Sequence, residues 1–464
     1  MVEKTKNKDE EVMEKIVSLC KRRGFIFQGS EIYGGLAGTW DYGPYGTELS
    51  NNIENLWWKM FISDREDMYG IDAAILMNPK VWEASGHVSG FSDPLVECVD
   101  CHLRFRNDHV LEALNRLNEN SDLDKMSQED KKMLVCSKTK KQHKYGPSRQ
   151  FNMMFKTHVG ATEDESSVSY LRPETAGGMF VNFKNVLDSL HPKIPFGLGQ
   201  IGKAFRNEIA PRDFVFRSRE FRQMEVEYFV KEADWKKSFE EWRRVMLSWC
   251  KEIGLNMSHV HELEVADSDR AHYSKRTIDI EFDYPFGRKE LYGLAYRTDF
   301  DLRAHSSASG VDISYFDEES KDRFIPHVIE PSLGVDRTIL AILSDAYTED
   351  NLGGETRIYL KFVPKIAPMK IAVFPLLKNK LELVEKAREI YKILKKEFGA
   401  VMFDDNGNIG KRYRRQDEIG TPWCVTVDFE TIEKDAGVTV RNRDTGEQKR
   451  MQVSELINFV KSQI

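Results

Sequence analysis

One segment, Phe214 to Val230 (FVFRSREFRQMEVEYFV), constrains the fold most, because its polar and apolar residues alternate. One parity carries Arg217, Arg219, Phe221, Gln223, Glu225 and Glu227, and the other carries Phe216, Met224, Val226 and Tyr228. This period of two predicts a strand with one packed face. A strand that is half-buried for purely structural reasons gives the same pattern. The polar face is more informative, since arginines, an aromatic ring and carboxylates in line can hold phosphates, stack a base and bind an amine.

Composition indicates an ordinary globular protein of two to four domains. The chain has 464 residues, of which 41% are hydrophobic and 31% charged, and a net charge of -7, which excludes a uniformly cationic coat for nucleic acid. No apolar run approaches the ~20 residues that cross a bilayer. Six unevenly spaced cysteines and a polar start favour a reducing compartment. We therefore expect a cytoplasmic enzyme without a membrane partner.

The remaining patterns predict an α+β protein. Val12, Ile16 and Leu19 predict a helix over 9–23, and a Gly-rich loop leads to a second helical pattern from Leu49 to Met60. An extended segment follows over 71–79. Alternating segments up to Ile329 favour an antiparallel sheet, and residues 330–347 are expected to form a loop that enters a buried helix.

Two further regions differ from this core. Residues 98–149 are polar and highly charged, which predicts an inserted lobe. After Pro364 and Pro368 the pattern alternates between strands and helices, which indicates an α/β domain. In it we expect strands over 369–376, 401–403 and 424–429, helices over 380–398 and 411–420, and a last helix capped by Ser454. The predicted domains are 1–97 with 150–364, 98–149, and 365–464.

The C-terminal domain is the candidate for an anionic partner. Residues 365–464 hold 19 Lys and Arg against 15 Asp and Glu, a net charge of +4, which leaves -11 for the rest. Its basic helix carries Lys411, Arg412, Arg414 and Arg415. A solvated face paired with Asp417 and Glu418 is the ordinary alternative.

Three cysteines in the inserted lobe raise the question of zinc. Cys98 and Cys101 have the spacing of a zinc knuckle, and Cys136 is a third thiol, with His102 or His143 as the nearest imidazoles. A second CxxC would need a cysteine at position 139, where the chain has Thr139. The sequence thus leaves a zinc site open, and we predict no metal ligand.

A dinucleotide fingerprint is excluded by its context. The stretch 197–202 (GLGQIG) matches the glycine spacing, but a helix must follow the last glycine, and residues 203–209 alternate like a strand. The sequence also contains no P-loop, no GxSxG and no HExxH motif.

Two other segments carry charges at unusual places. Arg337 falls in the first turn of an apolar helix, where the helix dipole opposes a cation, so an anion is expected beside it. That anion is either a phosphate of a ligand or an internal carboxylate. Glu174 in LRPETA is either a helix cap or a ligand for an amine.

These elements together resemble the three signature motifs of class II aminoacyl-tRNA synthetases, at 46–79, 205–229 and 332–343. The stretches EIYGG, TWDYGP, ASGH, RPETA, QIGKAFRNEI, RTDFDL, EPSLGVDR and GKRYRRQDEIGTP are similar to glycyl-tRNA synthetases of the single-chain, homodimeric type. The resemblance implies an antiparallel sheet flanked by helices, a C-terminal anticodon-binding domain, and ATP-dependent attachment of glycine to its tRNA through a glycyl-adenylate.

The resemblance also implies roles for individual residues. Arg206 and Arg337 would be catalytic, and ATP would be bound by Arg206, Asn207, Glu208, Phe216, Arg217, Phe221, Glu290, Leu291, Gly334 and Arg337, with Mg²⁺ near Glu290. Glycine would be bound by Arg106, Glu174, Phe221, Gln223, Glu225, Glu330 and Ser332. The tRNA would contact Lys411, Arg412, Arg414 and Arg415. A homodimer would form through the helix over 47–60, with Leu56, Trp57 and Met60 as its apolar surface.

Two positions depart from the resembling family, and two other functions stay open. Gly177 stands where the family has Gln, and Arg222 stands where it has Glu. Because Arg222 has the opposite parity from Gln223 and Glu225, we expect it to alter packing or surface. The open alternatives are a non-catalytic nucleic-acid-binding protein on the same fold and a synthetase for another amino acid.

Overall fold

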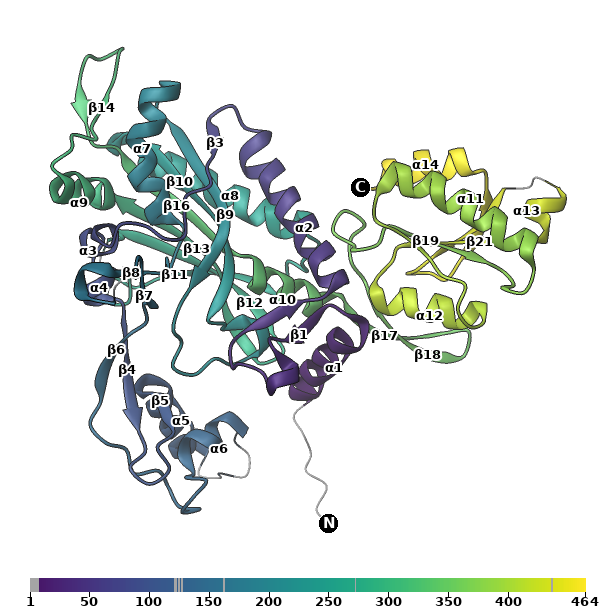
Figure 1. Ribbon diagram of the computed structural model, residues 1–464, viewed down its shortest axis with the longest axis horizontal. Coiled ribbons are helices and arrows are strands. Elements are labelled where there is room, and N and C mark those ends of the chain that lie inside the picture. The colour runs from purple at the N-terminus through teal and green to yellow at the C-terminus, as the bar shows by residue number, and fades with distance from the viewer. Residues whose placement is uncertain are drawn as a thin grey trace.

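A seven-stranded sheet forms the centre of the molecule (Figure 1). The computed structural model describes residues 8–120, 123, 126, 128–161, 163–271, 273–434 and 437–464. The strands run in the order β11 (Val260–Glu264), β12 (Arg276–Tyr284), β13 (Gly287–Thr298), β16 (His327–Gly334), β10 (Glu220–Val230), β9 (Phe196–Phe205) and β3 (Met68–Gly70). Every pairing is antiparallel except that of β3 with β9. The predicted α+β class and antiparallel sheet are confirmed.

Helices cover both faces of this sheet. The larger core lies beneath α1 (Lys8–Arg23), α2 (Pro44–Trp58), α8 (Trp235–Glu252) and α10 (Val335–Ala346), against Met224, Val226 and Tyr228 of β10. A second core joins Phe229 to α7 (Ala176–Leu190) and α9 (Phe300–Ser309) on the other face. The alternation of β10 thus places its polar residues on the same face as Phe229 and α7.

Shorter elements connect these layers. They are β1 (Ile26–Gln28), β2 (Trp40–Tyr42), a π-helical turn (Lys59–Ser63), α3 (Lys80–Ala84), α4 (His87–Gly90), β7 (Lys156–His158), β8 (Val168–Tyr170), β14 (Tyr315–Phe316), β15 (Arg323–Phe324), β17 (Tyr347–Leu352) and β18 (Glu355–Leu360). Among the described residues, no helix is both long and apolar enough to cross a bilayer.

Three predictions about this core are wrong. No strand covers the extended segment expected over 71–79. The short strand β3 ends before it, at Gly70, and within it Leu76 forms an isolated bridge to Leu171. Residues 330–334 belong to β16, because their neighbours β13 and β10 both pair with this stretch despite Pro331. Trp57 is fully buried in the core, so it adds nothing to an exposed face of α2.

The inserted lobe projects from one side of the core (Figure 1). It has a three-stranded sheet in the order β5 (Arg104–Arg106), β4 (Ser92–Glu97) and β6 (Arg149–Asn152), and the helices α5 (Asn107–Asn120) and α6 (Gln128–Leu134). A small core of its own includes Val96, Phe105 and Val110. The sheet of the lobe therefore includes β4, which ends just before residue 98.

The C-terminal α/β unit lies on the opposite side of the core from the lobe (Figure 1). Its five strands run in the order β20 (Val401–Phe403), β19 (Ile371–Pro375), β21 (Trp423–Val427), β22 (Val438–Asn442) and β23 (Gln448–Met451). Its helices are α11 (Leu381–Phe398), α12 (Ile409–Ile419), α13 (Phe429–Glu433) and α14 (Val453–Lys461). The predicted strands and long helices are confirmed within a few residues. The predicted cap at Ser454 is wrong, because Gln452 caps α14 with Glu455 in a capping box.

Candidate active site

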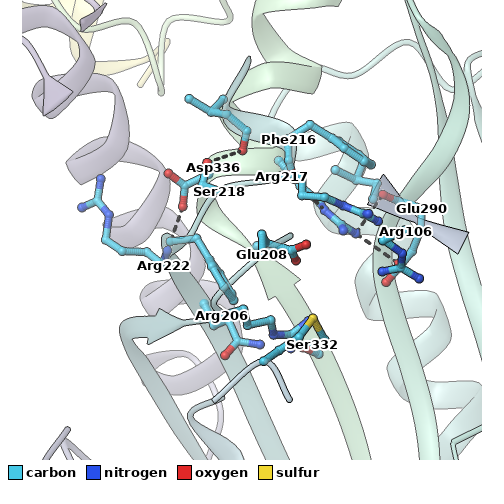
Figure 2. A pocket seen from close by; sticks show the side chains of 17 residues that line it. Arg106, Arg206, Glu208, Phe216, Arg217, Ser218, Arg222, Glu290, Ser332 and Asp336 are labelled. Atoms are coloured by element: carbon cyan, nitrogen blue, oxygen red, sulfur yellow. Dashed lines mark hydrogen bonds and ion pairs between the residues drawn. The ribbon is translucent and has the colours of Figure 1, made fainter. Parts of the chain in front are cut away.

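A cavity of about 280 Å³ opens over the polar face of β10. Its walls come from the end of β9, the 3₁₀ turn Phe214–Phe216, the strands β10, β13 and β16, and the first turn of α10. Figure 2 shows Arg106, Arg217 and Glu290 on one side of the cavity and Arg206 and Ser332 on the other. The antiparallel sheet brings these residues together although they are as much as 231 positions apart, from Arg106 to Arg337.

Arg206 is held in a fixed position directly after β9. Its guanidinium carbon lies 5.3 Å from the ring centres of both Phe91 and Phe221, and its Nε donates to the carbonyl of Pro173 at 3.2 Å. These contacts orient the planar cation, which suits it to receive a phosphate. Phe221, the residue expected to stack on adenine, is thus the neighbour of the main candidate phosphate ligand.

Arg337 forms an ion pair with an internal carboxylate, Glu290, which is one of the two partners that the sequence allowed. Its Nη1 lies 3.1 Å from Oε2 of Glu290 and 3.1 Å from the Glu290 carbonyl oxygen, and its guanidinium carbon lies 4.5 Å from the ring centre of Phe216. The Arg337 charge holds the pKa of Glu290 below its usual value. Arg337 is therefore paired and still lines the cavity.

Arg106 lines the cavity together with candidates for binding both ATP and glycine, among them Arg217 and Ser332. It forms ion pairs with Asp93 at 2.5 Å and Asp108 at 2.6 Å, and it stands near Glu208 and Arg217. The contact with glycine that the resemblance implied for Arg106 stays a prediction. His109 Nε2 accepts from Arg217 Nη1 at 3.5 Å, and burial, together with Arg212 and Arg217, lowers the pKa of His109 to about 3.

Three buried glutamates gather at the inner end of the polar face: Glu174, Glu225 and Glu330. Arg297, fully buried, donates to Glu330 Oε1 at 2.6 Å and binds both oxygens of Asp301 at 2.8 Å. Burial raises the pKa of Glu330 to about 8, assisted by Glu225 and Glu174. Burial alone would raise the pKa of Glu174, but His87 at 3.6 Å and Arg297 hold it below its usual value. The cluster therefore has carboxylates in excess of its cations, which favours binding of a positive ligand.

Glu225 is the most tightly held of the three. Its Oε1 accepts from the Ser332 hydroxyl at 2.7 Å, and its Oε2 accepts from the Thr175 N–H at 3.1 Å and from the Thr175 hydroxyl. Ser332 lies directly opposite Glu225 in the register of β16 and β10. Burial and the nearby Glu174 raise the pKa of Glu225.

Most predicted ligands of ATP and glycine meet in this region. The cavity is lined by Arg106, Arg206, Glu208, Phe216, Arg217, Phe221, Gln223, Glu290, Leu291, Ser332, Gly334 and Arg337. Glu174, Glu225 and Glu330 lie next to it in the buried cluster, whereas Asn207 is outside the lining, with its N–H bonded to the Met153 carbonyl. Sequence reasoning missed Arg297 and Thr175. The available signal for the first was Asp301, an opposite charge four residues after Arg297.

The departures at positions 177 and 222 both concern packing. A Cβ at Gly177 would lie 2.9 Å from the Trp82 ring, so that ring occupies the space of any side chain there. Arg222 forms an ion pair with Glu54 of α2 at 2.6 Å, on the face opposite Gln223 and Glu225. Its backbone N–H donates to Asp336 at 2.7 Å, and its side chain also reaches the cavity wall.

The glycines of the apparent dinucleotide fingerprint lie within β9, where neighbouring side chains leave no room for a Cβ atom. A Cβ at Gly202 would lie 2.2 Å from Nη2 of Arg172, whose guanidinium donates to the backbone carbonyls of Lys203 and Ala73. Because residues 197–202 are strand and no helix follows them, the exclusion of a dinucleotide site is confirmed.

The basic helix α12 offers fewer free cations than its sequence suggests. Arg412 is buried, with its guanidinium bonded to the carbonyls of Pro375, Asp405 and Gly407, so it is excluded as a surface ligand. Arg415 pairs with Asp404 at 2.6 Å and Arg414 with Glu355 at 3.1 Å. Lys411 is exposed.

Comparisons with known proteins match both parts of the chain. Residues 155–346 match the family described as tRNA synthetase class II core domain (G, H, P, S and T), and residues 370–463 match the anticodon binding domain. The chain is 51% identical over 457 residues to a glycine–tRNA ligase of Lachnospira eligens, covering 96% of this chain and 98% of that one. It is 50% identical to a glycine–tRNA ligase of Clostridium acetobutylicum, with 98% and 100% covered, and 49% identical to one of Bacillus anthracis, with 97% and 99% covered.

Proposed function

Because the chain belongs to the family of glycine–tRNA ligases, we propose that it attaches glycine to its tRNA with ATP, through a glycyl-adenylate. One observation carries this proposal: a cavity lined by arginines adjoins a buried carboxylate cluster, and Ser332 in the cavity wall donates to Glu225 of that cluster. The carboxylates suit the ammonium group of an amino acid, and the arginines suit a triphosphate. The amino acid and ATP would thus meet over β10.

The first step needs no protein nucleophile. A carboxylate oxygen of glycine attacks the α-phosphorus of ATP, and the bond to the bridging oxygen breaks, so that pyrophosphate leaves with its electron pair. The fixed Arg206 would donate to the α-phosphate as charge builds on it, while Arg217 and Arg337 would hold the β- and γ-phosphates. Glu174, Glu225 and Glu330 would hold the ammonium and so orient the attacking carboxylate.

Carboxylates beside Arg337 fit a magnesium ion. Glu281 of β12 lies opposite Glu290 of β13, and Asp279 lies two residues before Glu281 on the same strand. Burial, with Glu290 and Glu281 nearby, raises the pKa of Asp279 to about 7. Oxygen ligands of this kind are those Mg²⁺ prefers next to phosphates. Bound Mg²⁺ would supply charge neutralisation on the triphosphate, and Glu290 and Asp279 would hold it.

In the second step a ribose hydroxyl at the end of the tRNA attacks the carbonyl carbon of the adenylate, and AMP leaves. Glycine would be selected by lack of space: Glu174 and Glu330 are each less than 10% exposed, and Glu225 is hydrogen-bonded to both Thr175 and Ser332. A larger side chain would have to displace these buried groups, so no editing site is needed. The arginines of the cavity disfavour a non-catalytic relative.

We assign residues 1–97 and 150–364 to the catalytic domain, 98–149 to the lobe and 365–464 to the anticodon-binding domain. Residues 1–7 of the first range lie outside the described part of the chain. None of the six cysteines forms a disulfide, which fits the reducing cytoplasm as the site of action.

Charging of tRNA with labelled glycine tests the whole reaction and the role of α12. Changing Lys411→Glu in the full chain is expected to lower tRNA charging by roughly 3- to 10-fold, since it removes a phosphate contact, while ATP–pyrophosphate exchange stays unchanged. The matched control is Lys392→Glu on α11, which packs on the opposite face of the C-terminal sheet. Equal effects of the two changes on charging would remove α12 from the tRNA interface.

We propose a homodimer as the assembled form, supported by an exposed apolar loop. Ile32, Tyr33 and Leu36 are 89%, 87% and 56% exposed within one five-residue stretch, and such clusters mark surfaces that a partner covers. Sedimentation equilibrium at micromolar concentration is expected to give twice the chain mass, and Ile32→Asp with Tyr33→Asp is expected to shift it toward the monomer. A wild-type monomer would contradict the proposal.

A further inference from the structure

The inserted lobe contains two backbone turns of the same geometry, at 98–103 and 136–141. In each, the N–H of the fifth residue donates to the carbonyl of the cysteine that begins the turn, from His102 to Cys98 at 2.9 Å and from Lys140 to Cys136 at 2.8 Å. The N–H of each cysteine donates to the carbonyl of the sixth residue, from Cys98 to Leu103 at 2.9 Å and from Cys136 to Lys141 at 2.8 Å. His102 and Lys140 have φ angles of 58° and 57°. The two turns are therefore structural copies.

Both turns also aim backbone donors at their first sulfur. The N–H groups of Asp100 and Cys101 bond to Cys98, and those of Lys138 and Thr139 bond to Cys136. A turn that starts with cysteine and directs N–H groups at its sulfur stabilises a thiolate, which is the form that binds metal. Thr139 thus occupies the position where a second CxxC motif would have its second cysteine.

The missing fourth ligand comes from a different segment. Residues 142–145 run between the two turns, with Gln142 bridged to Val135 and Tyr145 bridged to Cys98. This places His143 Nδ1 at 3.7 Å from Cys101 Sγ, and the four ligand atoms of Cys98, Cys101, Cys136 and His143 all lie within 4.8 Å of one another. Bond lengths of about 2.3 Å to sulfur and 2.0–2.1 Å to nitrogen give tetrahedral edges of roughly 3.6–3.8 Å, close to this spacing.

The imidazole of His143 is oriented for such a bond. Its Nε2 lies 3.1 Å from the carbonyl oxygen of Lys132, so the ring hydrogen on Nε2 is donated there and Nδ1 keeps its lone pair toward the sulfurs. The ring stacks on Tyr145, with centroids 5.3 Å apart, and packs against Phe105 at 5.5 Å. His102, by contrast, is exposed and pairs with Glu97 at 3.2 Å.

We propose that Cys98, Cys101, Cys136 and His143 bind one structural Zn²⁺ ion that joins the two turns of the lobe. Four protein ligands leave no open position, so the ion would have no part in chemistry. The core of the lobe is small, and small folding units commonly need such a cross-link. The lobe also reaches the cavity, because Arg106 at the end of β5 is one of its lining residues. The proposal does not depend on the amino acid that the enzyme uses.

Metal analysis of the full-length protein, purified under reducing conditions without added metal, tests this directly. We expect about one zinc per chain, as for a closed structural site. Metal-free protein refilled with Co²⁺ is expected to show thiolate charge-transfer bands and the strong visible bands of tetrahedral cobalt. Absence of zinc, together with no cobalt spectrum from fully reduced protein, would overturn the proposal, as would another metal bound in its place.

Variants separate the two histidines. His143→Gln and Cys136→Ser are expected to reduce the zinc content at least tenfold, while His102→Gln keeps it, and chelation is expected to make residues 98–149 sensitive to protease while the core stays resistant. Because Cys136→Ser could unfold the lobe by itself, the cobalt spectrum of the wild type provides the independent readout. Loss of zinc in the His102 variant with retention in the His143 variant would contradict the assigned ligand set.

Discussion

Replacement of Arg206 by alanine is expected to lower the rate of glycine-dependent ATP–pyrophosphate exchange by about 10²- to 10³-fold. Arg206 is the cation that Phe91, Phe221 and the Pro173 carbonyl hold in place before any ligand arrives. A donor fixed in this way stabilises charge that develops on the α-phosphate in the transition state, so its loss should fall mainly on kcat. Exchange of labelled pyrophosphate into ATP measures this step without tRNA.

The matched control is Lys203→Ala, three residues earlier, near the end of β9. Lys203 is exposed, pairs with Glu220 and does not line the cavity, so exchange by this variant should equal that of the wild type. The melting temperature of Arg206→Ala should also stay close to the wild-type value, because within the described residues the side chain of Arg206 forms a single hydrogen bond, to the Pro173 carbonyl. Retained exchange in Arg206→Ala would show that the α-phosphate is bound elsewhere.

Replacement of Glu225 by glutamine is expected to raise the KM for glycine by about 10²-fold, which corresponds to roughly 3 kcal/mol for removing one partner of a buried charge pair. The change keeps the size of the side chain and removes its charge. It also places an amide N–H₂ or a carbonyl where Glu225 now accepts from both Thr175 and Ser332, so one of these bonds is lost. The KM for ATP should stay nearly constant.

Glu227→Gln provides an isosteric control on the same strand face. Glu227 is fully buried and does not line the cavity, and burial, with Glu330 nearby, raises its pKa well above the usual value. Exchanging this carboxyl for an amide of the same size should leave the KM for glycine within a few-fold of wild type. Equal increases in both variants would mean that Glu225 acts through the packing of β10 and not by binding the ammonium.

Local patterns in the sequence predicted much of the central sheet. The alternation of Gln223, Met224, Glu225 and Val226 predicted the two faces of β10, because a strand sends successive side chains to opposite sides. The same reasoning failed at Glu330, since Pro331 and Gly334 are typical of loops. There the pairing of β16 with strands on both sides outweighs local preference, and no pattern within eight residues reports that.

The contacts within the glutamate cluster could not be predicted, because they depend on register. Arg297 meets Glu330 through the pairing of β13 with β16, and Ser332 meets Glu225 through that of β16 with β10. Sequence spacing contains neither register. His143 is a similar case, since its position between the two cysteine turns is set by backbone bridges to Val135 and Cys98.

The net charge of the C-terminal domain predicted an anionic partner, but Arg412 is buried and does not contribute to a basic surface. A net charge of +4 counts every cation of the C-terminal domain as available to a phosphate. Arg412, however, donates to backbone carbonyls inside the domain, and Arg441 forms an ion pair with the buried Asp417 at 2.7 Å. Only burial distinguishes an arginine that ties the fold together from one that faces a phosphate.

ATP–pyrophosphate exchange measured with each of the twenty amino acids in turn tests the central claim most directly. The carboxylate cluster is buried and held by hydrogen bonds to Thr175, Ser332 and Arg297. It predicts exchange with glycine and exchange at least ~100-fold weaker with alanine and serine, because even one added group must displace buried hydrogen-bonded side chains. Strong exchange with a larger amino acid, or none with glycine, would contradict the assignment of Glu174, Glu225 and Glu330 as the glycine site.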